Sequence, residues 1–116
     1  MSRFAAAASI AVAALVLLAC TGSAGGAPIA TDTVDLPRSY RFAPADITLA
    51  SGTTVTWTNS DNFTHNVQFA DKGLSGEPLT MRPGETVQFT FATPGTYEYL
   101  CSLHPQDMKG SVVVTP

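Results

Sequence analysis

The sequence is poor in cysteine, histidine and positive charge, and each shortage narrows what the protein can be. Its 116 residues include only two cysteines and two histidines. Six Lys and Arg stand against nine Asp and Glu, which gives a net charge of −3 and argues against nucleic-acid binding. No Ser-His-Asp set, paired-carboxylate site, phosphate loop or nucleotide fingerprint appears, so nothing indicates an enzyme.

Long hydrophobic runs are also lacking outside the N-terminus. Residues 4–18 follow Arg3 and are apolar apart from Ser9, but a spanning helix needs about 20 such residues. The run ends in Leu-Leu-Ala-Cys20, which resembles a bacterial lipobox. We predict a lipoprotein signal peptide at 1–19, and a lipid anchor on Cys20 that holds the exported protein on the outer face of the cytoplasmic membrane, in the periplasm or at the cell surface. An ordinary signal peptide, in which Cys20 has no role, is the alternative.

The lipobox-like sequence affects the role expected for the second cysteine, Cys101. Two cysteines in an exported chain would ordinarily form one disulfide. If Cys20 carries lipid, Cys101 has no partner and is a leftover thiol in an oxidising compartment. Metal binding would explain it, and burial as a small apolar side chain is the alternative.

The rest of the chain reads as a tether followed by one all-β domain. Residues 20–30 are rich in Gly, Ala and Ser and predict a flexible tether. Residues 31–116 alternate short β-branched and aromatic runs with turn signals, a pattern typical of a sandwich or barrel. We expect Val55 and Trp57 on the inner face of their strand. Strands are predicted at 40–43, 46–50, 53–59 and 85–91, and a loop at 70–80.

Three possible metal donors lie within eight residues, at Cys101, His104 and Met108. Alone, each has an ordinary explanation, as a buried thiol, a solvated imidazole and a packed thioether. Together they favour a metal site, and His65, at the start of a predicted strand, is the remaining histidine that could complete it. Thiolate, imidazoles and a weak axial thioether suit both Cu(I) and Cu(II). Zinc also accepts Cys and His, but a closing Met makes it the less favoured metal.

These motifs resemble those of cupredoxins of the plastocyanin/amicyanin kind, the type 1 or blue copper proteins. The resemblance implies an eight-stranded Greek-key β-sandwich with one copper ion at one end. It implies His65, Cys101 and His104 as equatorial ligands and Met108 as the axial ligand. The matching segments cover nearly all of residues 38–116: Tyr40-Arg-Phe-Ala-Pro-Ala-Asp-Ile-Thr-Leu49, Gly52-Thr-Thr-Val-Thr-Trp-Thr-Asn59, His65-Asn66-Val67, Pro94-Gly-Thr-Tyr97 and Cys101-x2-His104-Pro105 with Met108-Lys-Gly110.

The resemblance also carries expectations about the surroundings of the site. Asn66 matches a family residue that ties the two ligand loops together by hydrogen bonds, here near Ser102. The His-x3-Met spacing lies between the His-x4-Met usual in plastocyanins and the His-x2-Met of amicyanins, so the strength of the axial Met108 bond cannot be carried over. Leu100 replaces the aromatic residue that plant plastocyanins use for remote docking. We therefore expect redox partner proteins to dock near His104.

The function that follows is that of a monomeric one-electron carrier outside the cytoplasmic membrane, which cycles between Cu(II) and Cu(I). Copper binding for delivery or sequestration is the alternative. It is less favoured because Met81 and Met108 are the only methionines after the predicted signal, and we expect Met81 to pack in the core. A copper enzyme would need further copper centres and a second domain.

Overall fold

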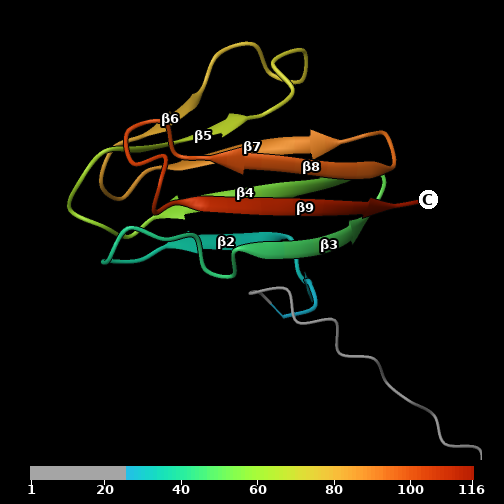
Figure 1. Cartoon of the computed structure of the whole chain (residues 1–116), viewed down its shortest axis with the longest axis horizontal. Helices are drawn as coiled ribbons and strands as arrows, with labels where there is room; N and C mark the ends of the chain where they lie inside the picture. The colour runs from blue at the N-terminus through green and yellow to red at the C-terminus, as the bar shows by residue number, and fades with distance from the viewer. Residues whose placement is uncertain (1–25) are drawn as a thin grey trace, which may run out of the picture.

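The computed structural model describes residues 26–116, which form two β-sheets packed against each other (Figure 1). One sheet has six strands in the order β1-β3-β9-β8-β5-β6, and the other has three in the order β2-β4-β7. This all-β Greek-key sandwich is the fold expected from the sequence. No helix long and apolar enough to cross a membrane occurs in the described part of the chain. The predicted signal peptide and Cys20 lie outside the described residues.

The described residues form nine strands, against the eight implied by the resemblance, and two of them are very short. Ile29 and Ala30, assigned to the tether by composition, pair with β3 and so form β1. The strands are β1 (Ile29–Ala30), β2 (Thr33–Leu36), β3 (Asp46–Ala50), β4 (Thr53–Asn59), β5 (His65–Phe69), β6 (Leu79–Met81), β7 (Thr86–Phe91), β8 (Gly95–Leu100) and β9 (Lys109–Thr115).

Alternation of apolar and polar residues builds the core. Val55 and Trp57 on β4 are fully buried, as the period of two along the strand predicted. β4 pairs antiparallel with β7. Across the sandwich, Ile47 of β3 and Val112 of β9 are also fully buried. Met81 belongs to the same core, as expected.

Two predictions of local structure were wrong. Residues 40–43 form no strand, because Ser39 and Tyr40 adopt positive φ angles of 96° and 52°, which break an extended backbone. Only an isolated bridge between Asp35 and Ala43 remains there. The predicted loop at 70–80 ends early, since Leu79 and Thr80 belong to β6 and pair with β5.

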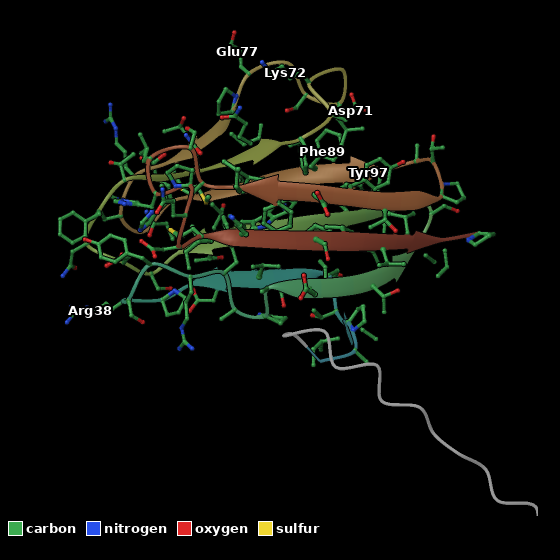
Figure 2. All side chains as sticks on the ribbon, viewed as in Figure 1. Arg38, Asp71, Lys72, Glu77, Phe89 and Tyr97 are labelled. Atoms are coloured by element: carbon green, nitrogen blue, oxygen red, sulfur yellow. The ribbon has the colours of Figure 1, made fainter. Side chains whose placement is uncertain are left out.

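The loop that remains between β5 and β6 stands away from the sandwich. Figure 2 shows Asp71, Lys72 and Glu77 on this loop, above Phe89 and Tyr97. All three charged residues are exposed to solvent. This charged loop is separate from the end of the sandwich where the candidate donors gather.

The topology brings three chain segments to one end of the sandwich. β5 begins at His65 and runs antiparallel to β8, with Gln68 opposite Leu100. β8 ends at Leu100, and the next strand begins at Lys109, which pairs with Leu100. Residues 101–108 therefore form a closed loop beside the start of β5, at the end opposite the C-terminus (Figure 1).

Candidate metal centre

Cys101 is the centre of the site, and its thiol is free and fully buried. It follows the last residue of β8, so its position is set by the sheet. The Sγ atom lies 3.7 Å from Nδ1 of His65. The backbone N–H of Asn66 donates to the same sulfur at 3.5 Å. The sulfur therefore faces the first two residues of β5, where it can bind a metal together with His65.

Backbone hydrogen bonds fold the loop after Cys101 so that its donors return to one place. The N–H of His104 donates to the carbonyl of Cys101 at 3.1 Å, and the N–H of Met108 donates to the carbonyl of His104 at 3.0 Å. The N–H of Cys101 then donates to the carbonyl of Met108 at 3.0 Å and closes the loop. The side chains of Cys101 and Met108 are both fully buried.

His65 is fully buried and has a hydrogen-bonding partner at each ring nitrogen. Nδ1 faces the sulfur of Cys101, while Nε2 lies 2.8 Å from Oδ2 of Asp61. The hydrogen bond from His65 holds the pKa of Asp61 below its ordinary value, although burial of the carboxyl acts in the opposite direction. The carboxylate therefore stays ionised beside the imidazole. Asp61 was not predicted as a site residue; the available signal was an acid four residues before a candidate ligand, in the turn that precedes it.

His104 stands at the rim of the site and is only half-buried. Its ring centroid lies 5.3 Å from that of His65 and 4.5 Å from that of Tyr40. Tyr40 also contacts the ring of Phe63, at 5.8 Å. Tyr40 has the left-handed backbone noted above, which an L-residue seldom adopts and which often accompanies a functional site. The sequence contained no signal for this placement.

The structure thus brings the four predicted donors to one end of the sandwich, but the distances between the donors differ. Cys101 and His65 are in contact, whereas His104 lies beside them at the surface. In residues 26–116, no three His, Cys, Asp or Glu side chains already stand close enough to hold a metal by themselves. The donor set nevertheless fits copper in kind, because a buried thiol, two imidazoles and a buried thioether are the ligands that suit both copper oxidation states.

Two side-chain hydrogen bonds join the loops that carry these donors. Nδ2 of Asn66 donates to Oγ of Ser102 at 2.7 Å. The backbone N–H of Ser102 donates to Oδ1 of Asn66 at 2.8 Å. Because Asn66 follows His65 and Ser102 follows Cys101, this pair connects the two donors that are in contact.

Comparison with known proteins decides the family. The family model described as "Copper binding proteins, plastocyanin/azurin family" matches residues 32–115. The chain belongs to this family. As a cupredoxin, it has one type 1 copper ion as its cofactor and is a copper protein rather than an enzyme.

Individual cupredoxins resemble the chain over most of its length. Amicyanin-alpha from Methylorubrum extorquens is 37% identical over 93 residues, which cover 76% of this chain and 75% of that protein. Plastocyanin from Scenedesmus fuscus is 37% identical over 83 residues, which cover 63% of this chain and 85% of that protein.

Solved structures of cupredoxins share the fold. The Cu(I) form of an amicyanin variant is 33% identical, with a TM-score of 0.64, and the match covers 75% of this chain and 86% of that one. A purple cupredoxin from Nitrosopumilus maritimus is 28% identical, with a TM-score of 0.61, and covers 73% of this chain and 100% of that one.

Proposed function

We propose that this cupredoxin is a one-electron carrier whose copper is held by His65, Cys101, His104 and Met108. The contact between the buried Cys101 thiol and the imidazole of His65, at 3.7 Å, is the observation that carries the proposal. Copper, when bound, supplies the change between Cu(II) and Cu(I). The chain's own part is to hold the donors still, because ligands that need not rearrange between the two oxidation states make electron transfer fast.

Rigidity of the donors follows from their surroundings. Cys101 and Met108 lie in a loop closed by the backbone hydrogen bond between them. His65 is the first residue of a paired strand and is held at both ring nitrogens. Burial of both sulfur donors keeps water from competing for the metal. These features favour a carrier over a delivery protein, which must release its copper.

Redox partners would dock where His104 reaches the surface. Phe63 and Leu103 are among the few large apolar side chains that are exposed, at 55% and 53%. Phe63 contacts Tyr40, and Tyr40 in turn contacts His104. Apolar and aromatic side chains of this kind are enriched at the centres of protein interfaces. An electron would then cross between the partner and the copper through the half-buried His104 ring, with the carrier acting as a monomer.

The test of the carrier function is the spectrum of the copper-loaded protein. Thiolate bound to Cu(II) should make it intensely blue, and electron exchange with a small redox dye should bleach the colour reversibly. Cys101→Ser should remain folded but colourless, whereas Met81→Leu, also in the buried core, should stay blue. A wild-type protein that binds copper tightly without colour would overturn the carrier function in favour of copper delivery or sequestration.

We further propose that the protein is exported and anchored by lipid on Cys20. The lipobox-like sequence before Cys20 supports this location. Cys20→Ala should move the protein from the membrane fraction to the soluble fraction. The control Cys101→Ser, which also removes one thiol, should leave the protein in the membrane fraction. If Cys20→Ala remains in the membrane fraction, the lipid anchor is wrong.

A further inference from the structure

Asp61 has a charged side chain in a buried position, which is unusual in a protein fold. Only 5% of its surface is exposed, and it is the only Asp or Glu in the described residues that is buried. Burying a charged group is costly unless it is paired and hydrogen-bonded. Its place in the turn between β4 and β5 therefore needs an explanation.

A chain of hydrogen bonds fixes this carboxylate. The amide of the fully buried Asn59 donates to the backbone carbonyls of Phe63 and Met81, at 2.8 and 3.1 Å, which ties the turn to β6. The backbone N–H of Asp61 donates to Oδ1 of Asn59 at 3.0 Å. The N–H of Asn62 then donates to Oδ1 of Asp61 at 2.7 Å. The remaining oxygen, Oδ2, is directed to Nε2 of His65 at 2.8 Å.

This arrangement selects one form of His65. A neutral imidazole carries one N–H, and its other nitrogen has a free lone pair. An ionised carboxylate only accepts hydrogen bonds, so Nε2 must carry the proton that it donates to Asp61. Nδ1 is then the nitrogen with the lone pair, and it is the one that faces Sγ of Cys101 at 3.7 Å.

We propose that Asp61 is a positioning residue of the copper centre, which presents Nδ1 of His65 to the metal and favours Cu(II) over Cu(I). This role rests on the proposed carrier function. A carboxylate hydrogen-bonded to a ligating histidine fixes the ring and raises its basicity as a ligand. A fixed negative charge behind the ring also stabilises the more highly charged metal ion. Both effects are greater for Cu(II), so Asp61 lowers the reduction potential of the bound copper.

Asp61→Asn tests this role, because its amide oxygen can accept from His65 while the negative charge and the hydrogen bond from Asn62 are lost. Cu(II) affinity should fall by about 10- to 100-fold, and Cu(I) affinity should fall less. The reduction potential should then rise, by about 59 mV for each tenfold difference between the two losses. Asp107→Asn is the matched control, since it removes an exposed carboxylate from the His104 loop; it should leave both affinities within about twofold of wild type, well under the tenfold scale of the effect on a histidine partner.

Two further measurements keep the proposal testable if Asp61→Asn folds poorly. Asp61→Glu should recover much of the Cu(II) affinity, since it restores the carboxylate. Nitrogen NMR of the metal-free wild type should show His65 protonated at Nε2 and bare at Nδ1; the reverse tautomer overturns the proposal.

The outcomes separate this role from the carrier function. An Asp61→Asn protein that is as blue as wild type and has the same potential overturns the role of Asp61 alone. A wild-type protein that never forms a blue copper centre overturns the carrier function, and the role of Asp61 with it.

Discussion

Replacing Asn66 by alanine should destabilise the fold at the point where the two donor segments are joined. The change removes both side-chain hydrogen bonds to Ser102, at 2.7 and 2.8 Å. A hydrogen bond of this kind contributes about 1 kcal/mol to stability. Because Ser102 is exposed, water can satisfy its freed groups, so no further large penalty applies. We therefore expect the free energy of unfolding to fall by about 2 kcal/mol.

Thermal unfolding of the metal-free protein, followed by circular dichroism, measures this change without any contribution from copper. For a domain of this size, a loss of about 2 kcal/mol lowers the unfolding temperature by about 8–16 °C. Ser102→Ala removes only the hydrogen bond to Oγ, so its effect should be about half as large. Gln68→Ala is a suitable control on the same strand, because the Gln68 side chain makes no hydrogen bond among the described residues.

A double-mutant cycle then isolates the contact between the two side chains. Asn66→Ala combined with Ser102→Ala should cost less than the sum of the single changes, by about 1 kcal/mol. Copper should also pass faster to a competing chelator from Asn66→Ala than from wild type. A change in stability below about 0.5 kcal/mol, the range of ordinary surface substitutions, would refute the view that Asn66 joins the two segments.

Three other changes test the site and its support. Met108→Leu should keep the copper but shift the reduction potential, whereas Met81→Leu, equally buried, should not; unchanged spectrum and potential in Met108→Leu would exclude Met108 as axial ligand. Gly110→Ala should lower stability in urea by about 1–3 kcal/mol, because a Cβ there would lie 2.5 Å from Cζ of Tyr99, while Gly26→Ala, with nothing within 4 Å, should have no effect. Burial raises the pKa of Tyr99 above its ordinary 10.0, so the tyrosine loses its proton at lower pH in the unfolded chain than in the folded one. The free energy of unfolding should therefore fall above pH 10, by about 1.4 kcal/mol per pH unit. Tyr99→Phe should show a shallower fall.

Local pattern predicted those parts of the fold in which neighbouring residues alternate. The strand at 53–59 agrees with the structure, since its period of two reflects one face against the core. The predicted strand at 40–43 is absent because Ser39 and Tyr40 adopt positive φ angles, which the alternation of neighbouring residues does not indicate. β6 was missed because Leu79 and Met81 become a strand only by pairing with β5. Such pairing depends on residues far along the chain.

The candidate site likewise has features that the local sequence predicts and others that depend on contacts between distant residues. Donor type and spacing along the chain are local properties, so the sequence itself determined which sulfur and nitrogen atoms could serve copper: those of Cys101, His104 and Met108, with His65 as the remaining imidazole. Only the tertiary structure decided that His65 lies against Cys101, that His104 stays at the rim beside Tyr40, and that Asp61 is buried behind His65. The physical reason is that these contacts form where loops from different strands meet. The effect of the Asp61 charge on its neighbours depends on how deeply the fold buries it, which no pattern along the sequence shows.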